Sequence, residues 1–329
     1  MKKRIKLISQ LSVVALFLLV PGRAQNNTAP PAGTGAPPPS NPLKVALLKW
    51  YGANTTTSFA VGTNPRGVCF DGANIWIANY GSNTVTKLAA NDGTVLGTFN
   101  VGTAPANVAF DGANVWITNF GSNNVTKLRA SDGALLGTFA VGVEPFGIAF
   151  DGANMWIGDA IGSTAVVTKL RASDGKTLGN FSINSYGFAV IFDGTYIWAS
   201  GNLGTVTRLK LDGTNAGVFN LGAPGDPYGL AFDGQNIWVA DQQAQGTLVK
   251  LRASDGALLA SINVGGGPYG VAFDGTYIWV SAGTYVAQVE PNSGKVLKTY
   301  PTTGNSTGIA FDGADLWITG YDGNIVLKM

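Results

Sequence analysis

The chain has 329 residues, of which 45% are hydrophobic and 12% charged, and its formal net charge is +2. This much apolar content excludes a disordered chain, and a single cysteine excludes an internal disulfide. The absence of histidine excludes Ser-His-Asp and Cys-His catalysis and histidine metal sites.

Residues 1–24 predict a signal peptide. Four basic side chains among residues 1–6 precede an apolar run over residues 7–20, and small residues at Gly22 and Ala24 suit cleavage after Ala24. The run is too short for a comfortable membrane span, and none like it follows. We therefore expect an exported protein without a membrane span, secreted, periplasmic or at the cell surface.

Removal of residues 1–24 leaves 16 basic against 19 acidic side chains, a net charge of −3. This weakly acidic balance argues against a nucleic-acid partner. Residues 25–42 are rich in Pro, Ala and Gly and predict an extended linker. Folded structure is expected from residue 43 to residue 329, as a monomer.

A motif, Phe-Asp-Gly-x-x-Ile-Trp or a close variant, occurs seven times in this region. Its tryptophans are Trp76, Trp116, Trp156, Trp198, Trp238, Trp279 and Trp317, at steps of 38 to 42 residues. Around each copy, short alternating segments are separated by Asp-Gly and other turn sequences, which predicts four antiparallel strands per repeat. Four strands at this period are typical of one β-propeller blade, so the fold class is all-β with seven four-stranded blades.

Both ends of the region predict how the ring closes. The final repeat stops after its third strand, near residues 324–329, while residues 57–61 match the fourth strand of other repeats. We expect the N-terminal strand to complete the seventh blade, which would remove two exposed sheet edges.

The segments Ile77–Val85 and Ile117–Asn123 resemble YVTN-type repeats, and residues 43–329 are similar to the propellers of the NHL and streptogramin-lyase (virginiamycin B lyase) group. The resemblance implies the scaffold. The lyases of this group use a histidine together with magnesium, so a chain without histidine is not expected to share their reaction.

The seven tryptophans and the seven Asp-Gly aspartates recur at fixed positions, so we interpret them as packing and turn residues. Function is expected where repeats differ. Loops before the first strand and between the second and third strands should meet at one face around the channel. The candidate ligand-binding residues on this face are Arg66, Asn79, Asn119, Phe146, Phe188, Tyr228 and Tyr269. The alternative is that they are ordinary solvated loop residues.

Four acidic residues on the same face, Glu144, Asp159, Asp226 and Asp241, are candidate ligands for Ca²⁺ or Mg²⁺. They come from blades that are not all adjacent in the ring, which puts their separation in question. No other cofactor is expected.

These observations favour a non-enzymatic exported scaffold that binds a protein, peptide or saccharide at the channel mouth. One alternative is a Ca²⁺- or Mg²⁺-dependent lyase or lactone hydrolase of the streptogramin-lyase or NHL-like group. Another is a structural role at the cell surface, with the linker as a spacer.

Overall fold

The computed structural model describes residues 57–329, apart from 160–165, 184–186, 202, 223–224 and 243–245. All described residues belong to the compact unit Ala53–Met329, while the other unit is Met1–Gly52. The expected signal peptide (1–24), the linker (25–42) and the start of the propeller at residue 43 lie outside the described residues and stay predictions.

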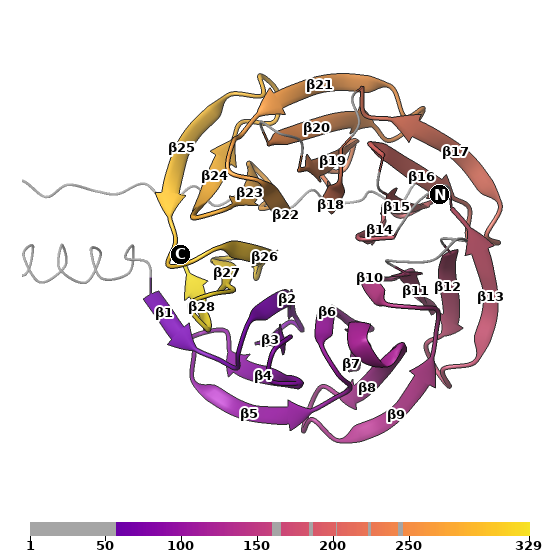
Figure 1. Ribbon diagram of the computed structural model, residues 1–329, viewed down its shortest axis with the longest axis vertical. Coiled ribbons are helices and arrows are strands. Elements are labelled where there is room, and N and C mark those ends of the chain that lie inside the picture. Colours follow the sequence, from indigo (N-terminus) through magenta and orange to yellow (C-terminus); the bar gives the residue numbers. More distant parts are fainter. Residues whose placement is uncertain (1–56, 160–165, 184–186, 202, 223–224, 243–245) are drawn as a thin grey trace, which may run out of the picture. The chain divides into compact units, whose positions relative to one another are not determined.

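The described chain forms seven four-stranded antiparallel sheets, arranged as the blades of a propeller (Figure 1). This confirms the predicted fold class. Within each sheet the first strand lies nearest the central channel and the fourth lies at the rim.

The strands follow in chain order, from channel to rim in each complete blade. Blade 1 contains β2 (Pro65–Phe70), β3 (Asn74–Asn79), β4 (Thr84–Ala89) and β5 (Val95–Asn100). Blade 2 contains β6 (Pro105–Phe110), β7 (Asn114–Asn119), β8 (Asn124–Arg129) and β9 (Leu135–Ala140). Blade 3 contains β10 (Pro145–Phe150), β11 (Asn154–Asp159), β12 (Val166–Arg171) and β13 (Thr177–Ser182). Blade 4 contains β14 (Val190–Phe192), β15 (Ile197–Gly201), β16 (Thr205–Leu209) and β17 (Asn215–Asn220).

Blade 5 contains β18 (Pro227–Phe232), β19 (Asn236–Asp241), β20 (Thr247–Arg252) and β21 (Leu258–Asn263). Blade 6 contains β22 (Pro268–Phe273), β23 (Ile278–Ala282), β24 (Tyr285–Val289) and β25 (Val296–Pro301). Blade 7 contains β26 (Ser306–Phe311), β27 (Leu316–Gly320), β28 (Ile325–Lys328) and the N-terminal β1 (Thr57–Ala60).

The ring closes as predicted, because β1 pairs antiparallel with β28 in the register Thr57 to Lys328. The ring of Phe59 on β1 stacks on the Trp317 indole of β27, with centroids 5.7 Å apart. The N-terminal strand therefore supplies both the edge and the aromatic packing that blade 7 needs.

Helical structure is limited to one 3-10 turn, η1 (Phe120–Ser122), within the described residues. None of the helices in this part of the chain is long and apolar enough to cross a bilayer.

The repeated motif forms the hairpin between the first and second strands, and its aspartate does more than shape the turn. In blade 2 the Asp111 carboxylate accepts hydrogen bonds from the backbone amides of Ala113 and Asn114 and, at 2.8 Å, from the indole Nε1 of Trp116. The indole bond recurs in all seven blades at 2.6–2.8 Å. We call the face that carries these hairpins the hairpin face.

Basic side chains join neighbouring blades on this face. Lys127 lies over the Trp116 ring at 4.9 Å and donates a 2.7 Å hydrogen bond to the Ala172 carbonyl of the next blade. Lys328 makes the corresponding bond from blade 7 to Ala90 of blade 1, at 2.8 Å. The ring is thus fastened between blades by repeated contacts, including the junction where its two ends meet.

Candidate functional site: the channel mouth

The opposite face of the ring, the channel-mouth face, carries the loops before each first strand and the turns between the second and third strands. Most first strands begin with Pro-x-Gly, as at Pro65-Arg66-Gly67. Proline suits the first strand position because it has no N–H to donate to the ladder. A Cβ at Gly67 would clash with the backbone of Asn107 in the next blade, so glycine lets the inner strands approach closely.

The residue between Pro and Gly is held by its backbone. The Thr319 hydroxyl of blade 7 donates to the Arg66 carbonyl at 2.6 Å, and the Thr118 hydroxyl of blade 2 donates to the Phe146 carbonyl at 2.9 Å. These bonds fix the start of each side chain while leaving its chemistry free to vary. The predicted variable position is therefore a well-defined point on the channel-mouth face.

Each blade contributes one aromatic ring to this face from one of two places, near the first strand or directly after the second strand. Tyr285, which opens β24 of blade 6, is a further aromatic residue on this face. Blades 3, 5 and 6 contribute the second residue of the first strand, namely Phe146, Tyr228 and Tyr269, and blade 4 contributes Phe188, two residues before its first strand. Blades 7, 1 and 2 contribute the residue directly after the second strand, namely Tyr321, Tyr80 and Phe120. We call these seven side chains the mouth aromatics.

Contacts between neighbouring rings make most of this set continuous. Phe188 stacks on Tyr228 with centroids 4.5 Å apart, and Tyr228 stacks on Tyr269 at 4.9 Å. Phe146 meets Phe188 edge-on at 5.9 Å and also lies 6.4 Å from Tyr269. Phe120 extends the set from Phe146, at 6.3 Å, toward blade 1. The sequence placed four of these rings on one face, and the structure brings all four into contact.

Arg66 contacts both groups of mouth aromatics, those of blades 3 to 6 and those of blades 7, 1 and 2. Its guanidinium carbon lies 4.1 Å from the ring centre of Tyr80, 5.3 Å from that of Tyr321 and 5.7 Å from that of Phe146. Such contacts place the cation over the aromatic faces and do not supply hydrogen-bond acceptors for all five of its N–H donors. Arg66 is the single cation among the predicted ligand-binding residues.

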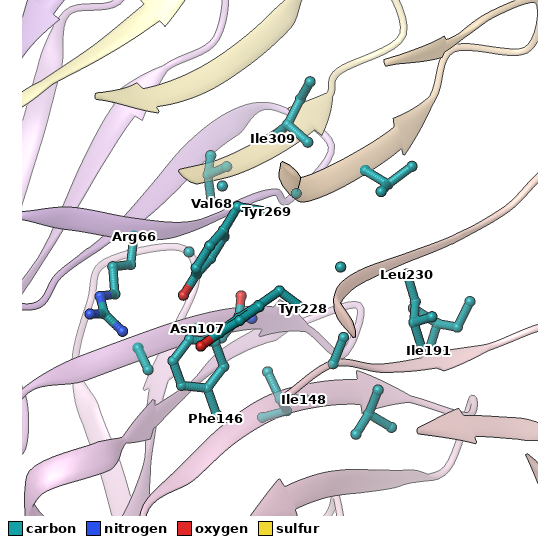
Figure 2. Close-up of a pocket in the computed structure, with 18 residues that line it drawn as sticks. Arg66, Val68, Asn107, Phe146, Ile148, Ile191, Tyr228, Leu230, Tyr269 and Ile309 are labelled. Carbon is teal, nitrogen blue, oxygen red and sulfur yellow. The ribbon is translucent and has the colours of Figure 1, made fainter. Parts of the chain in front are cut away.

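A cavity of about 170 Å³ lies in the channel beside these side chains (Figure 2). Arg66, Phe146, Tyr228 and Tyr269 line one part of it, as Figure 2 shows, and apolar inner-strand side chains including Ile148, Val68 and Leu230 line the rest. The site therefore combines flat aromatic groups, one positive charge and an apolar wall.

The two tyrosines stay neutral over a wide pH range. Burial raises the pKa of Tyr228, and the nearby Asp226 adds to the rise while Arg66 opposes it. Burial also raises the pKa of Tyr269 above its usual range, against the opposing effect of Arg66. Both hydroxyls therefore remain potential hydrogen-bond donors at physiological pH.

The two asparagines predicted to bind ligand lie inside the fold rather than on the aromatic surface. The fully buried Asn79 accepts a hydrogen bond from the Gly62 amide and donates to the hydroxyls of Thr84 and Thr86. Asn119 is also fully buried and donates to Asn124 and Thr126. Their amide groups are used to tie the ends of β3 and β7 to the following strands.

The four acidic candidates do not gather at one point. Asp159 and Asp241 are buried at the ends of β11 and β19, Glu144 is half-buried before β10, and Asp226 is exposed before β18. Among the residues that the structure describes, no three His, Cys, Asp or Glu side chains are grouped closely enough to hold a metal ion. A Ca²⁺ or Mg²⁺ site at these residues stays a prediction.

Asp159 differs sharply from the asparagines that it replaces. Only 2% of the residue is exposed, and neither carboxylate oxygen has a hydrogen-bond partner within the described chain. Burial raises its pKa to about 7. The adjacent Thr168 hydroxyl, which corresponds to Thr86 beside Asn79, is likewise buried without a partner there.

Sequence reasoning missed the rings of Tyr80, Phe120 and Tyr321. The signal was present, since an aromatic residue directly follows the second strand in blades 1, 2 and 7. In these blades the second residue of the first strand is Arg66, Ala106 or Thr307 instead of an aromatic residue. Comparing the two loop positions together would have shown that one replaces the other.

No protein-family profile and no curated protein sequence matches this chain. Many solved structures are similar to this chain, and three of them are described below. "Kuenenia stuttgartiensis Hydrazine Synthase" has a TM-score of 0.72 at 18% identity and covers 82% of this chain and 97% of its own. "Streptogramin B lyase structure" has a TM-score of 0.70 at 17% identity, with coverage of 83% and 96%.

The third similar structure is a catalytically inactive histidine-to-alanine variant of virginiamycin B lyase from Staphylococcus aureus with quinupristin. Its TM-score is 0.72 at 17% identity, and it covers 83% of this chain and 98% of its own. The scaffold resemblance to the streptogramin-lyase group is thereby confirmed. At these identities the likeness establishes the propeller fold and leaves the activity open.

Proposed function

We propose that this protein is an exported, non-enzymatic propeller that binds a protein segment, a peptide or a saccharide at its channel mouth. The observation that carries the proposal is the set of mouth aromatics. Each of the seven blades contributes one side chain to this set, from one of two alternative positions. Packing within a blade does not require such a set, because each blade already has its own buried tryptophan.

The physical character of the surface suits binding. Six of its seven rings are partly exposed, including the stacked Phe188, Tyr228 and Tyr269. Flat aromatic groups present a large contact area with little side-chain entropy to lose, and the hydroxyls add polar contacts. A concave, largely apolar site with a few polar groups is the usual form of a ligand pocket.

Export is supported by the basic and apolar pattern of residues 1–24. A non-enzymatic role is supported by the absence of histidine from a surface whose polar groups include one arginine, four tyrosines and scattered carboxylates.

The second candidate is a Ca²⁺- or Mg²⁺-dependent lyase or lactone hydrolase, and the likeness to two streptogramin-lyase structures favours it. One of these two structures is a catalytically inactive variant in which alanine replaces a histidine, and the present chain contains no histidine. Calorimetric titration with Ca²⁺ and Mg²⁺, before and after chelation, separates the candidates. Binding of either ion together with turnover of a lactone or streptogramin would favour the enzyme.

The binding proposal is tested on immobilised peptide and glycan arrays with the mature protein and two matched variants. Tyr228→Ala removes a half-buried tyrosine from the channel mouth, and Tyr277→Ala removes a half-buried tyrosine from the hairpin face. We expect Tyr228→Ala to lose the array signals and Tyr277→Ala to keep them. Array binding that survives Tyr228→Ala and is lost with Tyr277→Ala would place the site on the other face.

A further inference from the structure

Arg66 has no acidic partner within the described chain. Arg208 also lacks an acidic partner there, but its guanidinium donates hydrogen bonds to the carbonyls of Ala253, Ser254 and Ala216. The ion pairs found there are Arg129–Asp132, Arg171–Asp174, Arg252–Asp255 and Lys328–Asp315. The Nε of Arg66 is buried, and no atom of the described residues accepts a hydrogen bond from it. A guanidinium withdrawn from water normally forms hydrogen bonds with an acceptor, so this one is incompletely satisfied.

Neighbouring acids do not fill this role. Asp322, beside the Tyr321 ring that contacts Arg66, accepts a 2.7 Å hydrogen bond from Asn305. Three rings lie around the guanidinium carbon, with Tyr80 nearest at 4.1 Å. The guanidinium between them carries its donors in the fork geometry that matches a carboxylate.

A second unsatisfied donor lies in the same region. The hydroxyl of Tyr269 is buried and has no hydrogen-bond partner among the described residues. Figure 2 shows the Tyr269 ring directed across the channel with its oxygen on the side where Arg66 lies. Arg66 acts on the pKa of this hydroxyl, and Phe146 lies against both residues, at 5.7 Å from the guanidinium and 6.4 Å from the Tyr269 ring.

We infer that Arg66 and Tyr269 form an anion subsite that takes a carboxylate of the bound ligand, while the stacked rings hold the ligand's flat or aromatic part. This inference rests on the proposed binding function and narrows its ligand class. A carboxylate would accept hydrogen bonds from both unsatisfied donors and neutralise the unpaired positive charge. A neutral ligand can accept hydrogen bonds but leaves the positive charge of Arg66 without a counter-charge.

A carboxylate of this kind occurs at a peptide C-terminus and in an acidic sugar. Two matched pairs of probes separate these sources, N-acetylphenylalanine against N-acetylphenylalaninamide, and galacturonic acid against galactose. Within each pair only the charge group changes substantially. Binding to the mature protein is measured by NMR titration, because small probes of this size bind weakly.

We expect one of the acids to bind about ten-fold more tightly than its neutral partner, as charge-assisted hydrogen bonds from arginine predict. Arg66→Gln should abolish this preference and leave the neutral probe within about two-fold of its wild-type affinity. Arg66→Lys should retain part of the preference, since a point charge replaces the fork. Tyr269→Phe should lower it by a smaller factor. The exposed Arg129→Gln is the control and should change nothing.

Equal affinity for acid and neutral partner, or a preference that survives Arg66→Gln, would overturn the anion subsite and leave the binding proposal standing. Failure of all four probes to bind the wild-type channel mouth would overturn the subsite and count against the binding proposal as well. If Arg66→Gln does not fold, Arg66→Lys and the salt dependence of wild-type binding decide the question, because an arginine–carboxylate contact weakens as ionic strength rises.

Discussion

The two faces of the ring are built from the same seven repeats but use them in opposite ways. On the hairpin face every blade repeats one arrangement, in which an aspartate accepts a hydrogen bond from a buried indole. On the channel-mouth face equivalent positions carry arginine, alanine, threonine, phenylalanine or tyrosine. Only the backbone contacts that position them are shared, as at Arg66 and Phe146.

The difference indicates where each kind of constraint acts. A buried tryptophan with a satisfied N–H contributes packing that every blade needs, so its position is uniform. The residue between Pro and Gly is fixed through its carbonyl and faces the channel, so its side chain is free to serve a ligand. Stability should therefore be most sensitive to changes on the hairpin face, and binding to changes at the mouth.

The strongest test of this contrast is Trp116→Ala. The residue is fully buried, stacks on Phe139 at 5.4 Å and donates to Asp111. Loss of this packing should lower the free energy of unfolding by about 3–5 kcal/mol, measured by urea denaturation. A loss below about 1 kcal/mol would mean that the hairpin face is not the stabilising half of the repeat.

Asp159→Asn tests an exception at the mouth, where a carboxylate occupies the place of a buried asparagine. An amide should donate to Thr168 as Asn79 donates to Thr86, and it carries no charge to desolvate. Because the pKa of Asp159 is about 7 in the folded protein, the substitution should stabilise by about 2–4 kcal/mol at pH 8.

The sign of the pH dependence follows from the raised pKa of Asp159. Its protonated form fits the fold, so the wild-type protein loses this contribution as pH rises from about 4 toward 7. At pH 4 the Asn variant should gain little. Thermal unfolding of both proteins across this range checks the expectation, and an equal gain at pH 4 and pH 8 would contradict it.

Tyr228→Ala should separate stability from binding. The ring is half-buried and stacks on Phe188 and Tyr269, so its loss should reduce the free energy of unfolding by only about 1–2 kcal/mol. The same variant should lose the ligand contacts proposed above. A stability loss as large as that of Trp116→Ala, in the same urea titration, would make the mouth aromatics a structural core instead of a binding surface.

The smallest effect is expected for Arg129→Gln on the outer part of blade 2. Arg129 pairs with Asp132 at 2.9 Å, but both side chains are about half exposed. Exposed pairs of this kind contribute little, so the change in unfolding free energy should stay within about 0.5 kcal/mol. A larger loss would show that stability is not concentrated in the buried hairpin network.

Sequence periodicity was sufficient for the fold because blades repeat the residues that create them. Asp-Gly marks the hairpin and the tryptophan marks the buried second strand, so blade number and ring closure could both be predicted. The role of Asp111 as acceptor for Trp116 was not predicted, although the constant spacing between aspartate and tryptophan reflects it. The aspartate of the Asp-Gly motif has the same sequence pattern whether it only shapes the turn or also accepts the indole hydrogen bond.

The site was predicted less completely because its side chains come from different loops. Asn79 stands at the end of a strand beside the channel, yet its side chain turns inward to Thr86, and strand ends do not reveal this direction. Tyr80, one residue further, reaches Arg66 instead. The separation of Glu144, Asp159, Asp226 and Asp241 depends on how blades 3 and 5 are placed in the ring, which composition does not encode.

The pairing of β1 with β28 has a consequence for how the ring assembles. Of the described strands, β1 is synthesised first, but its only partner is synthesised last, so it must wait while six blades form from local hairpins. Contacts between such distant segments are slow to form, and an unclosed ring exposes two strand edges that can pair with other chains. A circular permutant that joins β28 directly to β1 would turn the closing step into a local hairpin. Its folding rate and its tendency to aggregate during refolding would show how much of the kinetic barrier lies at this junction.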